Sequence, residues 1–283
     1  MNNFVLGTAN FFKEYGLLKS NVKKNEVFKI LKYIKKKKYN YLDSSFEYDN
    51  FAKVSKEINF KKFNISSKIF VKKKFINSKN FSKKINELVR LKLKKLNINN
   101  FDIFFIHNFD NLNILEIKKI LHEFTKLKNE KMIKRIGASI YNKNSINKII
   151  KLDKIEVVQF PVSIIERKFL ANDILRNLKK RNIKIQARSI FAQGLIFKKN
   201  YFKKIDSLIN ETNSLKLNIL DLCLVFIKKL KFIDSVVIGV NNLKQFKQID
   251  SSFRKTKLNM KQINKIINNH SQSTFDLRKL NIL

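Results

Sequence analysis

Short apolar runs alternate along the chain with longer segments whose apolar residues recur every three or four positions. The short runs are rich in β-branched and aromatic residues, which is typical of buried strands, and the longer segments have the spacing of amphipathic helices. Eight strands are predicted in this way. They cover residues 4–9, 39–44, 63–70, 101–107, 135–141, 157–161, 184–190 and 235–240.

Three of the intervening segments show helical spacing most clearly, at residues 24–37, 80–96 and 214–230. We expect the apolar stripe of each helix to face the core rather than a binding partner. These stripes are Val27, Ile30, Leu31 and Ile34; Phe81, Ile85, Leu88, Val89 and Leu96; and Leu217, Leu220, Leu224 and Ile227.

Eight strands, each followed by a helix, are the count of an α/β fold of the (β/α)8 TIM-barrel type. A doubly wound open sheet is the competing fold, because the number of strands in a pattern is uncertain by one or two. No repeat or linker divides the chain, so a single domain over residues 1–283 is predicted. A barrel requires its functional groups to follow the C-terminal ends of the strands.

The net charge of +39 invites a nucleic-acid interpretation, since 61 basic residues face 22 acidic ones. Only 8 of the basic residues are arginine, the better ligand for phosphate and base edges, and the lysines are spread over every helical segment. We therefore expect lysine on solvated faces and no specific nucleic-acid partner. The alternative is a non-enzymatic or regulatory barrel protein that binds anionic partners through its basic surface.

Other classes of protein are excluded by composition. The single cysteine, Cys223, rules out a disulfide scaffold or a cysteine zinc site, and no His/Asp/Glu cluster has the spacing of metal ligands. No apolar run approaches the roughly 18 residues of a spanning helix, and no export signal is visible at the start. A cytoplasmic protein without membrane or metal is expected, as a monomer or weak homo-oligomer.

The five glycines are few enough to interpret singly. No G-x-G-x-x-G or P-loop pattern is present, so the usual phosphate-binding loops are absent. Gly137 lies inside a predicted strand, where close packing of neighbouring strands is the simplest reason for a glycine. For Gly194 and Gly239, packing and the close approach of a ligand phosphate remain equal alternatives.

Polar side chains follow three successive predicted strands and point to one chemistry. Asp43, Lys68 and His107 end the second, third and fourth strands, and Tyr48 follows in a loop. A phenol is a poor acid at neutral pH, but an adjacent ammonium lowers its pKa and a carboxylate holds that ammonium in place. A histidine beside it can orient a carbonyl oxygen. Such a group would protonate a carbonyl that receives a hydride.

His107 is the strongest single candidate, because a polar residue ends a run of four apolar ones. The other two histidines, His122 and His270, lie in helical segments rich in lysine and asparagine and are expected on the surface.

The sequence resembles the aldo-keto reductase family, and specifically its branch associated with polysaccharide biosynthesis. Eight segments in the family's order carry the resemblance over nearly the whole chain. They are Leu6-Gly7-Thr8-Ala9; Leu42-Asp43-Ser44-Ser45-x-x-Tyr48; Ser66-Ser67-Lys68; Phe105-Ile106-His107; Lys134-Arg135-Ile136-Gly137-Ala138-Ser139; Val157-Val158-Gln159-Phe160-Pro161; Arg188-Ser189-Ile190-Phe191-Ala192-Gln193-Gly194-Leu195; and Val237-Ile238-Gly239-Val240-Asn241-Asn242 with Gln245.

The resemblance implies a barrel enzyme that reduces a small aldehyde, ketone or sugar-like carbonyl with NADPH or NADH. It implies Tyr48 as general acid, Lys68 as the group that lowers the pKa of Tyr48, Asp43 as the partner of Lys68, and His107 as the group that orients the carbonyl. The cofactor-binding residues that it implies are Ser139 and Gln159 for the nicotinamide amide; Arg188, Ser189 and Phe191 after the seventh strand; and Gly239, Asn241 and Gln245 at the adenosine end.

The sequence departs from the family pattern at three places that concern the cofactor. Ile140 stands where many members have asparagine, and Arg188 stands where many have an aromatic residue. The basic residues that clamp an adenosine 2′-phosphate are replaced by Val240 and Gln245. The choice between NADH and NADPH therefore stays open.

Overall fold

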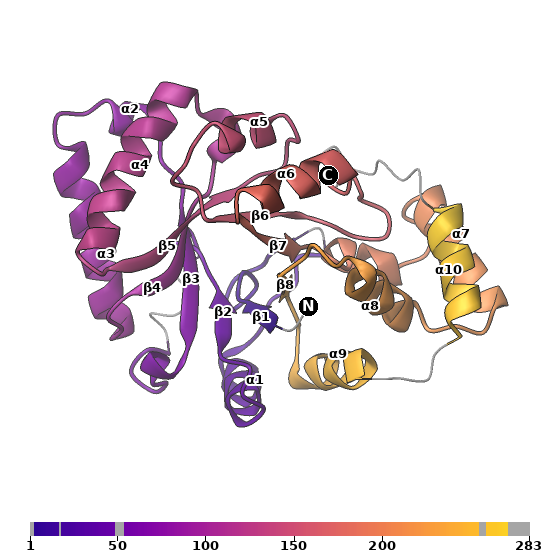
Figure 1. Cartoon of the computed structure of the whole chain (residues 1–283). Helices are drawn as coiled ribbons and strands as arrows, with labels where there is room; N and C mark the ends of the chain where they lie inside the picture. The colour runs from indigo at the N-terminus through magenta and orange to yellow at the C-terminus, as the bar shows by residue number, and fades with distance from the viewer. Residues whose placement is uncertain (1–2, 17, 49–53, 255–258, 271–283) are drawn as a thin grey trace.

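A computed structural model of the chain describes residues 3–16, 18–48, 54–254 and 259–270 (Figure 1). The eight strands are β1 (Asn3–Gly7), β2 (Tyr41–Asp43), β3 (Asn64–Ile69), β4 (Phe101–Ile106), β5 (Ile133–Ser139), β6 (Val157–Pro161), β7 (Lys184–Arg188) and β8 (Ser235–Ile238). The α-helices are α1 (Lys24–Lys36), α2 (Lys73–Ile76), α3 (Phe81–Leu96), α4 (Ile114–Asn129), α5 (Ser145–Ile150), α6 (Asn172–Lys180), α7 (Lys203–Ser214), α8 (Ile219–Lys229), α9 (Leu243–Arg254) and α10 (Met260–Asn269). Short 3-10 helices cover Phe60–Lys62 (η2), Phe109–Asn111 (η3) and Ala192–Phe197 (η4).

The strands form a closed parallel barrel in chain order from β1 to β8. Closure is visible at Leu6 of β1, which pairs in register with Leu42 of β2 on one side and with Ile238 of β8 on the other. An open sheet leaves its edge strands unpaired, so this pairing excludes the doubly wound alternative. The (β/α)8 barrel is confirmed, and each predicted strand overlaps one observed strand, although β1 and β5 begin one and two residues before their predicted starts.

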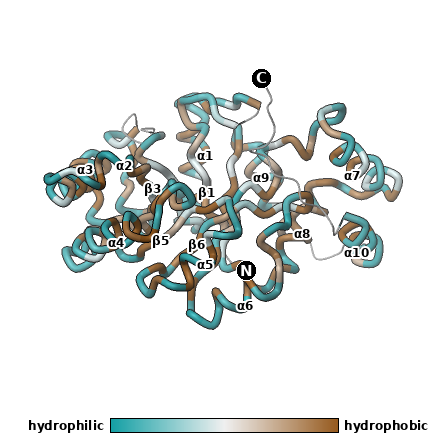
Figure 2. Tube along the Cα trace, turned by 90° about the horizontal axis from the view of Figure 1, so that it is seen from above, coloured by the Kyte–Doolittle hydropathy of each residue, from teal (hydrophilic) through white to brown (hydrophobic). Residues whose placement is uncertain are grey.

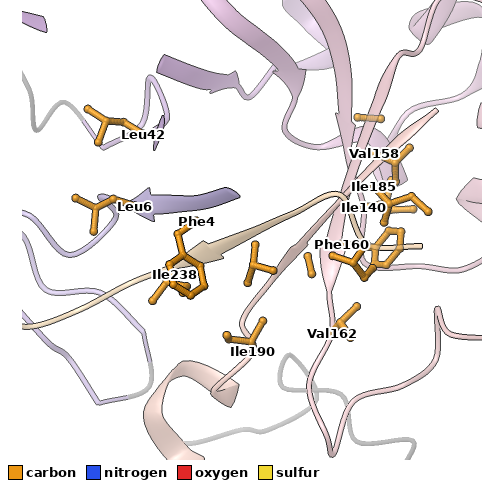
Figure 3. Close-up of a cluster of buried hydrophobic side chains, with 14 of the residues drawn as sticks. Phe4, Leu6, Leu42, Ile140, Val158, Phe160, Val162, Ile185, Ile190 and Ile238 are labelled. Carbon is orange, nitrogen blue, oxygen red and sulfur yellow. The ribbon is translucent and has the colours of Figure 1, made fainter. Parts of the chain in front are cut away.

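The main hydrophobic core lies between the barrel and the surrounding helices. Figure 3 shows part of it, with Phe4 and Leu6 of β1, Phe160 of β6 and Ile238 of β8, all of them buried. Figure 2, viewed from above, shows hydrophilic positions along the outer faces of the helices. Lys83, Lys84, Lys94 and Lys95 of α3 follow this pattern and are exposed. These four lysines thus lie on a solvated face, as the sequence predicts.

A second, smaller cluster is formed by Ile103, Phe105 and Val157. A Cβ atom added to Gly137 would lie 2.3 Å from Cδ1 of Phe105, a distance that real contacts never reach. The Phe105 ring therefore occupies the space that a side chain at position 137 would need. Close packing is the reason for this glycine, as predicted.

Two helix predictions need correction. The segment 214–230 was predicted as one helix, but α7 ends at Ser214 and α8 begins only at Ile219. The start of α8 is set by Asn218, whose side chain accepts the backbone N–H of Leu220 at 2.8 Å. Leu88 of α3 is 42% exposed and does not belong to the core stripe, which Leu93 completes instead.

His270 differs from its predicted surface position as well. It is buried, and its Nε2 lies 3.0 Å from the Glu211 carboxylate of α7. His122 remains largely exposed, as predicted. Among the described helices, none combines the length and apolarity needed to cross a bilayer.

Candidate active site

The barrel places the predicted catalytic residues around one end. Asp43 ends β2, Lys68 lies near the end of β3, and His107 follows β4 directly. Parallel strands carry all their C-terminal ends to the same rim, so residues 25 and 39 positions apart in the chain become neighbours. The backbone N–H of His107 donates to the carbonyl of Ile69 at 2.9 Å, which extends the β3–β4 pairing to the histidine.

Asp43 and Lys68 form a buried ion pair at this rim. The Lys68 Nζ lies 2.5 Å from the Asp43 Oδ2 and 3.3 Å from the backbone carbonyl of Ser44. The side chains are 7% and 3% exposed. A buried charge is costly unless it is paired and hydrogen-bonded, and this pairing meets that requirement.

A buried polar network continues from this pair across the barrel interior. Gln159 of β6 donates through Nε2 to the Asp43 Oδ1 at 3.0 Å and to the Gln186 Oε1 at 2.5 Å. Gln186 in turn donates to the Ser235 hydroxyl at 3.1 Å. Because β2 and β6 are not neighbours in the barrel, the bond between Gln159 and Asp43 must cross its interior. This network fixes the carboxylate that holds Lys68.

Tyr48 lies in the turn after β2, above the ion pair. The Lys68 Nζ is 6.0 Å from the centre of the Tyr48 ring and 5.8 Å from that of Phe105. The ring of Tyr15, from the loop after β1, meets Tyr48 edge-on at 5.9 Å. The predicted tyrosine, lysine and aspartate are therefore brought together.

The pKa of Tyr48 is displaced opposite to the prediction. Burial raises this pKa well above the ordinary value of a tyrosine, and the neighbouring Tyr15, Asp43 and Tyr141 raise it further. Arg188 opposes the shift but does not reverse it. Removing a phenolate from water costs more than the charge of Arg188 recovers, so Tyr48 is protonated across the physiological range.

His107 has a partner that sequence reasoning missed. Its Nδ1 lies 3.0 Å from the Glu47 Oε2, and Glu47 also accepts the backbone N–H of Phe70 at 2.8 Å and the hydroxyl of Ser45. Burial alone would raise the pKa of Glu47, but the hydrogen bonds from His107, Ser45 and Phe70 outweigh it and lower the value to about 2. Glu47 is thus an anion beside the histidine.

Arg188 ends β7 and its guanidinium stacks on the ring of Tyr141, with Cζ 3.9 Å from the ring centre. One of its N–H groups approaches the backbone carbonyl of Ile140 at 3.4 Å. Two of the positions where the sequence departs from the family pattern, Ile140 and Arg188, are therefore in contact, and Tyr141 packs beside them.

Ser139 and Gln159, the residues predicted to hold the nicotinamide amide, are register partners on β5 and β6. Both are buried. The Oε1 of Gln159 has no hydrogen-bond partner among the described residues. A buried acceptor without a donor is costly, and a donor from a bound amide would satisfy it.

The segment after β7 has an unusual backbone. Ser189, Ala192 and Gln193 adopt left-handed conformations with φ of 57°, 50° and 55°, and Gly194 follows at 90°. Gly194 thus has a conformational reason of its own. Phe191 is buried and packs against Phe197 at 5.5 Å between ring centres, which leaves its backbone rather than its ring for a ligand.

The predicted adenosine end lies where β8 leads into α9. A Cβ atom added at Gly239 would meet nothing within 4 Å, so packing gives no reason for this glycine. The side chain of Gln245 accepts the backbone N–H of Asn241 at 2.8 Å, and Asn10 donates to the Asn241 side chain at 3.0 Å. Glu26 of α1, which sequence reasoning missed, accepts the N–H of Leu243 at 2.7 Å.

Residues 3–268 match the aldo/keto reductase family. The chain belongs to the aldo/keto reductase family. It is therefore a carbonyl-reducing oxidoreductase of a family that acts on small carbonyl substrates and generally uses NAD(P)H. The family match does not assign the chain to the polysaccharide-biosynthesis branch that the sequence resembles. No curated protein sequence matches the chain.

Solved structures of other aldo-keto reductases share the fold at low identity. The chain is similar to the holo form of aldo-keto reductase AKR11C1 from Bacillus halodurans, with a TM-score of 0.74, 16% identity, and 96% and 95% of the two chains covered. It is also similar to the glycerol dehydrogenase AKR11B4 from Gluconobacter oxydans, with values of 0.71, 17%, 96% and 93%. For the aldose reductase from Schistosoma japonicum these values are 0.68, 17%, 100% and 92%.

Some of the residues that the structure adds left a trace in the sequence. Gln186 is a polar residue inside an apolar strand, which is itself a sign of an interior network. Glu47, Tyr15 and Tyr141 lie in loops, where their residue types are common, so no pattern distinguishes them. Among the described residues, no group of three or more His, Cys, Asp or Glu side chains is placed to hold a metal ion.

Proposed function

We propose that the protein reduces a small aldehyde, ketone or sugar-like carbonyl to an alcohol with NADH or NADPH, with Tyr48 as general acid. The observation that carries the proposal is the buried Asp43–Lys68 pair under the Tyr48 ring, with His107 on the neighbouring strand end. A buried ion pair beneath a phenol is costly to form and serves few structural purposes. Proton transfer from that phenol to a carbonyl oxygen would give the pair a function.

Tyr48 holds the proton that the carbonyl oxygen receives. Its raised pKa keeps this proton in place at neutral pH until negative charge develops on the oxygen. The phenolate that remains is stabilised by the Lys68 ammonium, which Asp43 holds in position. His107, which follows β4, would contact the same oxygen.

The residues present fit a nicotinamide cofactor. Ser139 and the unpaired Oε1 of Gln159 would hold the carboxamide, and the space over Gly239 would admit the adenosine end. The backbone after β7, with Ser189 and Arg188, would lie along the pyrophosphate. When bound, the cofactor supplies the hydride for carbonyl reduction.

The proposal takes residues 1–283 as one catalytic domain. The Arg188-Ser189 pair and the Gln193-Gly194-Leu195 run support membership of the branch associated with polysaccharide biosynthesis, which makes sugar-derived carbonyls the first substrates to assay.

The test is a titration with NADH and NADPH, followed by a panel of carbonyls read at the absorbance of the reduced cofactor. Thermal shift and tyrosine fluorescence report binding, since the chain has no tryptophan. Tyr48→Phe should retain cofactor binding and lose roughly 10²- to 10⁴-fold in turnover. The matched control is Tyr201→Phe, at a tyrosine that is 48% exposed on the surface, which should leave turnover unchanged. Full activity in Tyr48→Phe would contradict the mechanism, and absence of binding by either cofactor would contradict the function.

A further inference from the structure

We infer that Glu47 is a positioning residue that fixes the proton of His107 on Nδ1, so that His107 donates to a substrate carbonyl only as the imidazolium. The inference rests on the proposed function for the reaction it affects. It concerns a contact that lies outside the Asp43–Lys68–Tyr48 group, and it makes the carbonyl reduction sensitive to pH through the histidine.

The geometry around Glu47 leaves it one role. Its Oε1 accepts the backbone N–H of Phe70 at 2.8 Å, and its Oε2 receives the Ser45 hydroxyl and lies 3.0 Å from the His107 Nδ1. Held by three donors, the carboxylate is an acceptor only. A hydrogen bond at 3.0 Å between an ionised carboxylate and a ring nitrogen requires the proton to be on that nitrogen.

The state of the second ring nitrogen follows from this assignment. A neutral imidazole carries one proton, so with Nδ1 protonated its Nε2 presents a lone pair. A carbonyl oxygen is also an acceptor, and two acceptors do not form a hydrogen bond. His107 therefore contacts a carbonyl oxygen favourably through Nε2 only when both nitrogens are protonated. In the alcohol complex the neutral ring accepts the substrate hydroxyl instead.

Other titratable groups at this rim do not provide the same control. Asp43 and Lys68 neutralise each other in their buried pair. Tyr48, whose pKa is raised by burial, keeps its proton well beyond the range in which histidines titrate. Tyr15, Tyr141 and Arg188 lie around Tyr48 and act on the pKa of its phenol. A loss of reduction rate with rising pH is therefore assigned to the proton of His107.

The decisive variant is Glu47→Gln, which preserves size and removes the charge. The N–H of Phe70 needs an oxygen at the Oε1 position, so the new amide turns its NH₂ group toward the His107 Nδ1. The Ser45 hydroxyl retains an acceptor in the Lys68 carbonyl, 3.3 Å away. A donor now faces Nδ1, and the neutral ring must carry its proton on Nε2.

The ring ¹⁵N shifts of His107 read the tautomer directly, without turnover or cofactor. With three histidines in the chain, His107→Asn identifies the signals. The wild-type protein at alkaline pH should show Nδ1–H, and Glu47→Gln should show Nε2–H. The control is Glu211→Gln, since Glu211 and His270 form an equal 3.0 Å pair between α7 and the end of α10, and it should leave the His107 signals unchanged.

The pH profile of carbonyl reduction supplies the second measurement. Once the imidazolium loses its proton, kcat/KM of the wild type should fall by about tenfold per further pH unit, because the imidazolium is the competent form. In Glu47→Gln this alkaline decline should disappear, while wild-type and Glu211→Gln profiles coincide. A loss of local packing would lower the rate at every pH and leave the decline in place.

An Nε2–H tautomer in the wild type, or the same alkaline decline in wild type and Glu47→Gln, would overturn the inference. Failure of the wild type to reduce any carbonyl would defeat the proposed function instead, and the ¹⁵N tautomer would still decide whether Glu47 fixes the proton of His107.

Discussion

The Nζ of Lys68 lies 2.5 Å from the Oδ2 of Asp43, and both side chains are almost completely removed from solvent. This pair joins β2 to β3, and through Gln159 it is connected to β6 on the far side of the barrel. Under the proposed function, stability and catalysis therefore depend on the same buried charges.

Replacing one member of the pair should destabilise the protein strongly. Asp43→Asn leaves a buried ammonium without its counter-charge, which should lower the free energy of unfolding by about 3–5 kcal/mol. The double variant Asp43→Asn with Lys68→Met should recover much of this loss in a denaturant titration and remain inactive. Glu130→Gln, at the exposed pair with Arg90, should cost less than about 1 kcal/mol. Equal losses at the two sites would contradict the buried-pair interpretation.

Two glycines should respond differently to the same substitution. Gly137→Ala drives a methyl group into the Phe105 ring and should cost about 1–3 kcal/mol of stability, which Phe105→Leu should partly restore. Gly239→Ala meets no neighbouring atom, so its thermal midpoint should match the wild type while its affinity for NADH falls. Unchanged cofactor affinity in Gly239→Ala would show that no ligand approaches this position.

The carboxylate of Glu26 at the start of α9 should favour NADH over NADPH. Its acceptance of the Leu243 N–H lowers the pKa of Glu26 and keeps it charged where the adenosine end is proposed. Glu26→Gln removes one repulsive charge and should improve NADPH affinity on the order of tenfold, with little change for NADH. The control is Glu57→Gln. Glu57 forms a 2.5 Å ion pair with Lys24, which lies in α1 like Glu26. Equal changes in the affinities for NADH and NADPH would show that the 2′-phosphate of NADPH does not lie near Glu26.

Stability should decline at alkaline pH because of Tyr39. Burial, together with its hydrogen bond to Asp250 at 2.6 Å, raises the pKa of Tyr39 to about 12. The unfolded chain releases this proton near the ordinary value of about 10. The stabilisation of the folded state that comes from the raised pKa of Tyr39 is therefore complete below about pH 10 and is lost as the pH rises toward about 12. Thermal midpoints over this range test it, and Tyr39→Phe should flatten the decline.

Asp250 should act in the opposite direction. Burial opposes ionisation of this carboxyl, but hydrogen bonds from Tyr39 and Arg254 prevail and lower its pKa. Its contribution is present at neutral pH and is lost as the pH falls through the lowered value. Asp250→Asn should lower the thermal midpoint at pH 7 and reduce the difference between pH 7 and strongly acidic solution. An unchanged acid dependence would contradict this assignment.

Much of the fold could be predicted because its determinants are local. The period of the apolar residues decides between strand and helix, and eight alternations leave few closed arrangements. The boundary at Asn218 was missed because a capping residue interrupts a pattern that is apolar on both sides. Leu88 was assigned to the core stripe of α3 because it lies next to that stripe around the helix, a fraction of a turn from the buried face.

By itself, the sequence determined the barrel, the close packing at Gly137 and the placement of Asp43, Lys68 and His107 on successive strand ends. Tertiary structure alone decided which groups face these residues. The Glu47 carboxylate meets His107 across 60 positions of chain, and Tyr15 meets Tyr48 from another loop. The direction of the Tyr48 pKa depends on burial, a property of the whole rim. Charge and hydrogen bonding act through space, so the identity of a neighbour is fixed only when the barrel closes.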